Sequence, residues 1–467
     1  MATHPATGNV RLSLWRRVRE YAVPPSMIET ATARRRAGDW AGACAAAGVD
    51  VDLDLRAVAR AHGRDLAARV RDDLRHLAPD LLRWHLPRIA PDGLLRPGLT
   101  LALAHYDTPG TDGPAPPHLV VRTPPAWADG GQRIGLALWD GTPATADARH
   151  HPHPRPSRRF RLDLHRHLWD ARRAGELRVR SGADRPPDEE VPEPLRAVPD
   201  GHRCAVGRWA AEAGLLLAAE GRDSGAVLVR LGGGQRLLLD VVTDGSAAPR
   251  IAAVTAPADG GGFSGMPVLP DAATWVPPDL ELLRAGELTA DRLHPLVAAA
   301  LVPGRAPDSA HERRAPASGT HVVPCRGARH RIGLVDGVLA PLDHTPEEIR
   351  REELLAALTG EPLPCLRIVD AFHRSPDCLP DVRERLHHGD VTGALAVVEG
   401  LLGREAVLRD GPLRDALDGA ARRRVAHGMY RAGLADPGPG RFRAVAGSGH
   451  RKRRRPRTDA LPTKTFY

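Results

Sequence analysis

Residues 262–267, with the sequence GFSGMP, contain the serine whose neighbours best suit a nucleophile, Ser264. A catalytic serine needs a histidine base and a carboxylate that orients this histidine. His202 precedes Ser264 in the chain, and Asp240 or Asp244 lies between them. Ser264, His202 and Asp240 are therefore the candidate residues of a serine hydrolase.

The pattern G-x-S-G-x-P resembles the sequence around the nucleophile of trypsin-like serine peptidases, and His202-Arg203-Cys204 loosely resembles their His-Cys pair. The resemblance implies a two-barrel fold with a catalytic triad. However, only 62 residues separate His202 from Ser264, which is too few for that fold. The residues after Pro267 also have a helical pattern where the fold needs strands. We expect residues 262–267 to form a glycine-rich turn, and keep the hydrolase as an alternative.

Two other groups of polar residues suggest weaker chemistry. His105 and Asp107 follow an apolar run, where acid–base pairs often lie, but Asp107 leads to Pro109-Gly110 and favours a turn. Imidazoles bind zinc or copper, and five histidines gather in one region: His150, His151, His153, His165 and His167. No acidic or cysteine ligand stands at a metal-site spacing beside them. The sequence predicts a solvated loop here.

The cysteines and glycines predict no metal, cofactor or nucleotide site. The five cysteines are scattered, with no C-x-x-C pair: Cys44, Cys204, Cys325, Cys365 and Cys378. We expect them to be free thiols. Gly232-Gly233-Gly234 lacks the lysine and the spacing of a phosphate loop, and a strand pattern follows it.

A dense basic cluster lies near the C-terminus. Residues 441–467 carry nine Lys or Arg and one Asp, a net +8 of the chain's +9. Such a cluster can neutralise phosphates without reading sequence, so six residues are candidates for polyanion binding: Arg451, Lys452, Arg453, Arg454, Arg455 and Arg457. The alternative is a disordered tail that keeps the body soluble. Lysine is otherwise absent, as in proteins from GC-rich genomes, so the number of arginines alone carries little weight.

Composition predicts a globular protein of several domains. The chain has 467 residues, 42% of them apolar and 26% charged, which exceeds one ordinary domain. No window approaches the roughly 18 uncharged apolar residues of a membrane helix. The first 30 residues lack the features of a signal peptide. We therefore expect a cytoplasmic protein without membrane contact.

Periodicity predicts helices at both ends and strands between them. Helical spacing covers residues 10–93, including one long helix over 55–77, and returns after 345. Strand patterns cover 99–103, 118–123, 133–139 and 159–165, followed by a central β stretch with runs at 226–231, 236–242 and 250–255. Asp336-Gly337 predicts a hairpin between 329–335 and 338–342. Thr345, Pro346 and Glu348 predict a capped helix that stops at Gly360, and two later helices are expected over 412–419 and 420–432.

One short pattern occurs twice. Gly38-Asp39 and Gly389-Asp390 each follow a helix with a basic end, and small residues come next. Glycine ends one helix and aspartate caps the following one. The pattern predicts two αα-hairpins of similar construction.

We thus expect an α+β protein with helical N- and C-terminal units flanking a strand-rich central region. The expected divisions are a helical unit over 1–94, a mixed β-rich unit over 95–302, a linker over 303–319, a β-hairpin plus helical unit over 320–434, and a disordered basic tail over 435–467. No catalytic constellation stands out, so the favoured function is a non-enzymatic protein-interaction or scaffold protein with an unknown protein partner. The serine hydrolase and the polyanion-binding tail are the alternatives.

Overall fold

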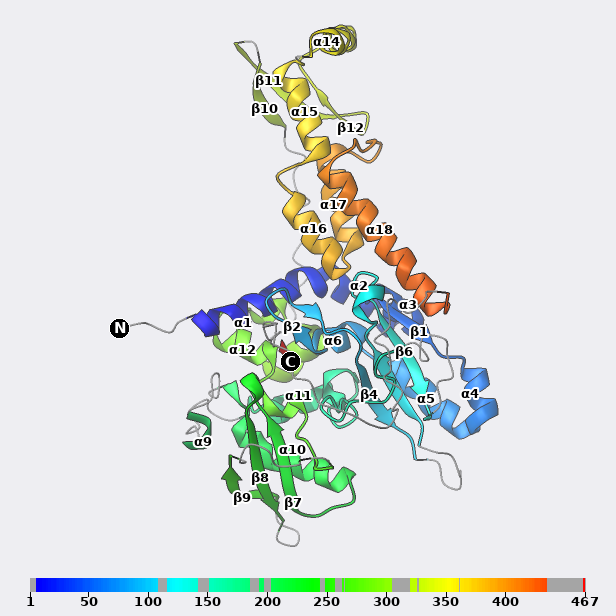
Figure 1. Cartoon of the computed structure of the whole chain (residues 1–467), viewed down its shortest axis with the longest axis vertical. Coiled ribbons are helices and arrows are strands. Elements are labelled where there is room, and N and C mark those ends of the chain that lie inside the picture. Colours follow the sequence, from blue (N-terminus) through cyan, green and yellow to red (C-terminus); the bar gives the residue numbers. More distant parts are fainter. Residues whose placement is uncertain are drawn as a thin grey trace, which may run out of the picture. The chain divides into compact units, whose positions relative to one another are not determined.

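The computed structural model divides the chain into two compact units (Figure 1). Unit 1 comprises residues 1–307 and 428–467, and unit 2 comprises residues 308–427. The chain is mixed α+β, with helices at both ends and a strand-rich middle, as predicted. The residues described are 6–107, 116–141, 151–184, 193–196, 203–243, 248–256, 263, 265–304, 320–325, 327–360, 362–434 and 465–466.

Unit 1 begins with a run of helices. Its helices are α1 (Ala6–Arg17), α2 (Pro25–Arg36), α3 (Trp40–Ala46), α4 (Leu55–His62), α5 (Arg64–His76), α6 (Pro79–Trp84), α8 (Leu177–Arg180), α9 (Glu193–Arg196), α10 (Val206–Ala219), α11 (Asp271–Thr274), α12 (Pro278–Arg284) and α13 (Pro295–Leu301). Single turns of π or 3-10 helix cover Val18–Ala22, Ala126–Ala128, Arg166–Leu168, Ala174–Glu176, Gly232–Gly234 and Ala290–Arg292.

Three sheets belong to unit 1. The largest has the order β1-β6-β5-β4, with β1 parallel to β6 and the other pairs antiparallel; its strands are β1 (Val49–Asp52), β4 (Thr100–His105), β5 (His118–Arg122) and β6 (Ile134–Trp139). The predicted central sheet is present as the antiparallel meander β7 (Gly225–Arg230), β8 (Arg236–Val242) and β9 (Arg250–Thr255). A short sheet joins β2 (Arg88–Ile89) to β3 (Leu94–Leu95) and to β13 (Thr465–Phe466).

Buried hydrogen bonds between side chains join parts of unit 1 that are distant in the sequence. Asp279 of α12 accepts hydrogen bonds from Nε1 of Trp84 at 2.7 Å and from Nη2 of Arg19 at 3.1 Å. The Arg19 guanidinium also lies 3.9 Å from the centre of the Trp84 ring. Buried charges are tolerated when they are paired in this way. The same hydrophobic cluster contains buried residues from both sides of position 94, and the boundary expected there stays a prediction.

Unit 2 packs one small sheet against a helical array. The sheet has the order β10-β11-β12, all antiparallel, with β10 (His321–Cys325), β11 (Ala328–Val335) and β12 (Val338–Pro341). Its helices are α14 (Pro346–Thr359), α15 (Pro364–Arg374), α16 (Leu379–His388) and α17 (Val391–Leu402), and α18 (Pro412–Arg431) begins in unit 2 and ends in unit 1. Asp336 and Gly337 have φ of 49° and 77°, which is the conformation of the predicted two-residue hairpin turn.

Both expected αα-hairpins form, with the same hydrogen bonds. Asp39 accepts from the Gly42 N–H at 2.8 Å, and Asp390 accepts from the Gly393 N–H at 2.9 Å. The preceding glycines have φ of 79° and 85°, which glycine alone adopts without strain. The predicted capping box at Thr345 and Glu348 is also present.

Three local predictions were wrong, and the strands β1, β2, β3 and β13 were missed. Residues 159–165 form turns with one bridge between Ala102 and Arg161, and no strand. The helix expected over 55–77 is two helices separated at Gly63, whose φ is 91°. The two helices expected over 412–432 are the single helix α18. No helix among the residues placed by the structure is long and apolar enough to cross a membrane.

Candidate metal centre

Most of the residues that the sequence favoured for chemistry lie outside the described residues. These are Ser264, His202 and the basic cluster Arg451, Lys452, Arg453, Arg454, Arg455 and Arg457. Asp240 is described and lies exposed on β8. The hydrolase and the polyanion-binding tail therefore stay predictions.

The pair His105 and Asp107 lies at the surface end of β4. Their closest side-chain atoms, Nε2 and Oδ1, are 3.8 Å apart, which is too far for a hydrogen bond. The His105 ring stacks on His118 with centroids 4.6 Å apart. Tyr106 between them is buried and donates its hydroxyl hydrogen to Asp73 at 2.8 Å. The segment holds β4 against α5, and the acid–base role of His105 and Asp107 stays a prediction.

Two described histidines of the 150–167 region, His151 and His165, are buried beside different partners. His151 is buried, with Nε2 3.0 Å from the Thr123 carbonyl oxygen. His165 is buried too, and its Nε2 lies 3.2 Å from Oε2 of Glu212. The expected solvated loop is wrong for these two rings, which are structural contacts in the core.

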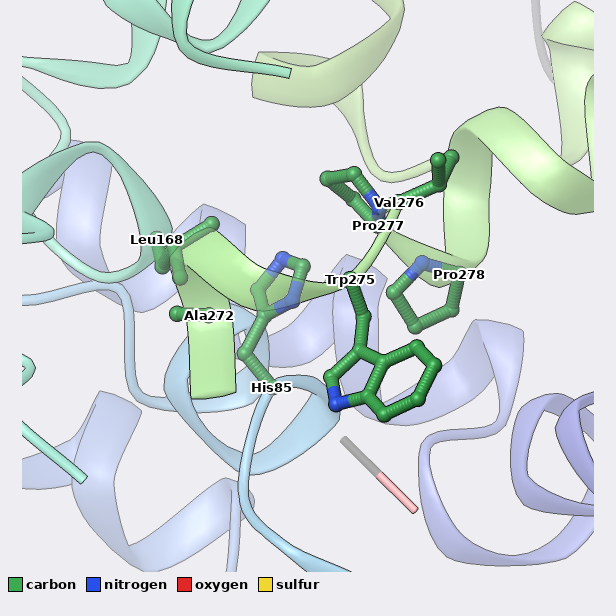
Figure 2. Close-up of a pocket in the computed structure, with 7 residues that line it drawn as sticks. All are labelled: His85, Leu168, Ala272, Trp275, Val276, Pro277 and Pro278. Atoms are coloured by element: carbon green, nitrogen blue, oxygen red, sulfur yellow. The ribbon is translucent and has the colours of Figure 1, made fainter. Parts of the chain in front are cut away.

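A small pocket in unit 1 is lined mainly by apolar side chains (Figure 2). The lining residues are His85, Leu168, Ala272, Trp275, Val276, Pro277 and Pro278. The space suits about one water molecule. Burial lowers the pKa of His85 to about 4, so this ring is neutral near pH 7. The pocket is too small for a substrate, and we assign it no function.

Unit 2 contains a cluster of side chains of the kinds that bind metal ions. It is built first by the hairpin of β10 and β11, whose register pairs Cys325 with Ala328 and Val323 with His330. Residues directly opposite in antiparallel strands share one face, and so do residues two apart in one strand. Cys325 and His330 therefore lie on the same face of the hairpin, next to each other.

The third member, His344, is brought in by the next turn of the sheet. After β12 the chain returns to β11, where the Leu342 N–H donates to the Arg331 carbonyl at 2.8 Å. Asp343 accepts from the backbone N–H of Arg331 at 2.6 Å and from its Nη2 at 2.7 Å. This clamp lowers the pKa of Asp343 to about 2. It places His344 directly beside His330.

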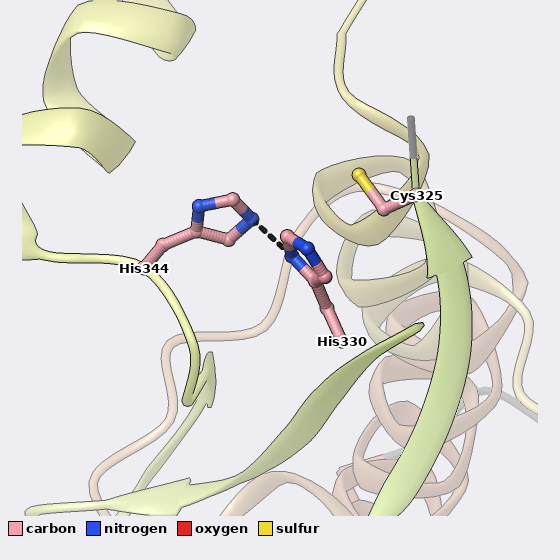
Figure 3. Close-up of side chains that lie close together, drawn as sticks. All are labelled: Cys325, His330 and His344. Carbon is pink, nitrogen blue, oxygen red and sulfur yellow. Dashed lines mark hydrogen bonds between the residues drawn. The ribbon is translucent and has the colours of Figure 1, made fainter. Parts of the chain in front are cut away.

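The three side chains converge on one point (Figure 3). Sγ of Cys325 and one ring nitrogen each of His330 and His344 all lie within 4.8 Å of one another. Nδ1 of His330 and Nε2 of His344 are 2.7 Å apart and share a hydrogen bond. Cys325 is buried and both histidines are half-buried. This is the one such cluster of Cys, His, Asp or Glu among the residues that the structure places.

Two further residues surround the cluster. Sγ of Cys365, the second residue of α15, is 3.7 Å from Sγ of Cys325. Burial, followed by the neighbouring Cys325, raises the pKa of the Cys365 thiol to about 11, so the thiol is protonated without a metal. Oε2 of Glu348 lies 3.8 Å from Nδ1 of His344. A carboxylate behind a histidine ligand is a common second partner in metal sites.

Thiolate and imidazole donors together select zinc among the abundant divalent metals. They suit it because the soft sulfur and the borderline nitrogen match its chemistry, at distances of about 2.0–2.3 Å. A metal held by these two nitrogens would replace the hydrogen bond that the rings share. We find that the donor set and its convergence fit a zinc ion.

Sequence spacing alone does not reveal this cluster, because its members do not lie at short metal-site spacings in the chain. Cys325 and His330 are five residues apart across a tight turn at Gly327, while His344 and Cys365 lie 14 and 35 residues beyond His330. A search for a Cys and a His flanking a predicted hairpin turn would have found the first two. The expectation of no metal site stays a prediction, now set against a specific geometry.

No family model, curated protein or solved structure matches this chain.

Proposed function

We propose that the protein is a non-enzymatic interaction protein in which unit 2 is a zinc-binding module. The single observation that carries the zinc assignment is the convergence of Cys325, His330 and His344 within 4.8 Å. These residues come from the end of β10, from β11 and from the segment that leads into α14. A metal held by all three would lock the hairpin to the start of that helix.

The proposal gives the metal a structural role. Unit 2 has a small hydrophobic cluster, formed by one face of a three-stranded sheet and the helices behind it. A metal that binds only the folded form of such a unit adds to its stability. Because the site rarely exists in the unfolded chain, metal binding adds directly to folding free energy.

Metal analysis of the purified full chain tests the assignment. We expect about one zinc per chain, and loss of most of it in Cys325→Ser and in His330→Gln. Cys378→Ser and His387→Gln are matched controls, because both residues lie in unit 2 but outside the cluster; they should keep the metal. A chain without stoichiometric metal after reconstitution in reducing buffer would contradict the proposal.

A specific observation also favours protein interaction. Helix α14 has no buried residue. Even its leucines Leu354, Leu355 and Leu358 are 63%, 46% and 86% exposed. Exposed apolar side chains grouped on one helix mark interaction sites. The helix also has four glutamates against two arginines. We propose that its partner is a protein with an apolar groove and a basic rim, which receives the helix.

Site-specific photo-crosslinking tests this surface. A photoreactive residue at Leu358 should capture a protein from the native cell, and the purified partner should then bind the wild-type chain. Leu358→Glu should weaken that binding by at least about 10-fold, because it places a charge in an apolar groove. Val407→Glu, at another exposed apolar site of unit 2, is the control. Equal binding by both variants would contradict the role of α14.

The alternatives from the sequence keep their own tests. A hydrolase would lose activity on ester or peptide substrates in Ser264→Ala. A polyanion-binding tail would lose DNA or RNA binding at low salt when residues 441–467 are deleted. A cytoplasmic location is also part of the proposal.

A further inference from the structure

We infer that Cys365 is the fourth ligand of the metal in unit 2, which makes a closed site of two sulfurs and two nitrogens. This inference rests on the proposed zinc function and goes beyond it. Three ligands leave an open position for water or substrate, whereas four protein ligands close the site. The identity of the fourth ligand therefore decides whether the metal is structural or reactive.

The distance between the two sulfurs supports this assignment. Sγ of Cys325 and Sγ of Cys365 are 3.7 Å apart. A disulfide needs about 2.05 Å, so the two residues are not bonded. Two thiolates on one tetrahedral zinc, each about 2.3 Å from the metal, lie about 3.8 Å apart. The observed separation thus matches the edge of a zinc site.

The burial of both thiols also supports a cation shared between them. Cys365 has no exposed surface and Cys325 is 2% exposed. Two buried thiols facing each other make only a weak hydrogen bond. A cation bound by both sulfurs would satisfy them together.

Among the residues of unit 2 that the structure describes, no other fourth ligand typical of a His2Cys site joins the cluster. Blue-copper sites add a long axial bond, usually from methionine. Methionine occurs in this chain only at positions 1, 27, 266 and 429, and residues 308–427 contain none. The Glu348 carboxylate lies 3.8 Å from Nδ1 of His344, the ring nitrogen that does not share the hydrogen bond with His330. Cys365 is the residue in contact with a ligand already assigned.

Zinc binding would replace the thiol protons of Cys325 and Cys365 by bonds to the metal. Two S–H bonds break, two protons pass to solvent, and two Zn–S bonds form. The hydrogen that His330 and His344 share moves to the far nitrogen of its ring, so that Nδ1 of His330 and Nε2 of His344 each bind zinc. If His344 carries this hydrogen on Nδ1, it faces the Glu348 carboxylate. The two ring nitrogens, now 2.7 Å apart, would separate to about 3.3 Å, and the other ligand atoms would approach one another to about 3.3–3.8 Å.

A closed site would join two parts of unit 2 that the sheet alone does not connect. Cys325, His330 and His344 belong to the sheet and its extension, while Cys365 belongs to α15. The helix already packs on the sheet, since Cys365, Val323 and Ile332 share one hydrophobic cluster. Zinc would fasten this contact at its end. No coordination position would remain for a reaction at the metal.

Cobalt substitution of the full chain tests the fourth ligand. Co²⁺ bound by two thiolates should show tetrahedral d–d bands and a thiolate charge-transfer band. Cys365→Ser should lose about half of the charge-transfer absorption and bind zinc at least about 100-fold more weakly, since even outer partners of a ligand are worth about 10–100-fold. Cys378→Ser should match the wild type in both measurements.

Two measurements on the wild-type chain keep the test independent of variant folding. Zinc titration in weak buffer should release about two protons per metal, and X-ray absorption of the zinc form should show two sulfur neighbours. One sulfur neighbour, or a Cys365→Ser variant with unchanged affinity and absorption, would overturn the fourth ligand and leave the zinc proposal standing. No metal binding, or a Cys325–Cys365 disulfide mapped in metal-free protein, would overturn both.

Discussion

We predict that the effects of substitutions at Asp390 and Gly393 on stability are coupled. Asp390 caps α17 by accepting the Gly393 N–H at 2.9 Å. A Cβ added to Gly393 would lie 2.1 Å from Oδ2 of Asp390, closer than any real contact. Gly393→Ala must therefore expel the carboxylate that forms the cap. The same geometry recurs in unit 1, where a Cβ on Gly42 would lie 2.1 Å from Oδ2 of Asp39.

The expected free energies follow from this clash. Losing an aspartate N-cap costs about 1 kcal/mol, and the 2.8 Å contact between Asp390 and Arg385 is lost as well. Alanine in place of helical glycine recovers up to about 1 kcal/mol. Gly393→Ala alone should be nearly neutral. In the Asp390→Ala background the cap is already gone, so the same change should stabilise unit 2 by about 1 kcal/mol.

A double-mutant cycle measures this coupling. Hydrogen exchange of the α17 amides in the full chain reports the stability of unit 2 separately from unit 1. We expect a coupling energy of about 1 kcal/mol. Gly400→Ala is the control, because Gly400 lies in α17 with nothing within 4 Å of its added Cβ, and its effect should be the same in both backgrounds. Additivity of Gly393 and Asp390 within about 0.3 kcal/mol would refute the clash.

Three further predictions concern acid and metal. The pKa of His85 is about 4 in the folded protein and about 6.5 in the unfolded chain, so the unfolded chain binds the proton first as pH falls. The free energy of unfolding of unit 1 should therefore decrease by up to about 3 kcal/mol between pH 6.5 and pH 4. His85→Asn should flatten this part of the curve of stability against pH. His165 and Arg180 lower the pKa of Glu212 to about 2 against the opposing effect of burial, so its contribution should be present above pH 4.5 and disappear as pH falls through 2, with Glu212→Gln showing no such loss. Chelation of zinc should lower the denaturation midpoint of unit 2 alone, and an unchanged midpoint would contradict a structural metal.

Local sequence determined the elements whose ends are specified by a few neighbouring residues. The hairpin turn at Asp336-Gly337 and the capping box at Thr345 depend on conformations that only these residue types favour. The repeated Gly-Asp pattern predicted both αα-hairpins for the same reason. The central sheet was also predicted, because its β-branched runs are separated by turn residues. In each case the interactions join residues close in sequence.

Tertiary packing decided what local pattern left open. Residues 159–165 alternate like a strand, yet Phe160 and Leu162 are buried from a series of turns. An alternating pattern records which side chains are buried, but a strand also needs a hydrogen-bonded neighbour along its length. The four-residue strand β1 exists because β6, over 80 residues later, offers it a parallel partner. The candidate zinc site depends on the same kind of contact. Cys325 and Cys365 are 40 residues apart in the chain, and only the packing of α15 against the sheet brings their sulfurs together.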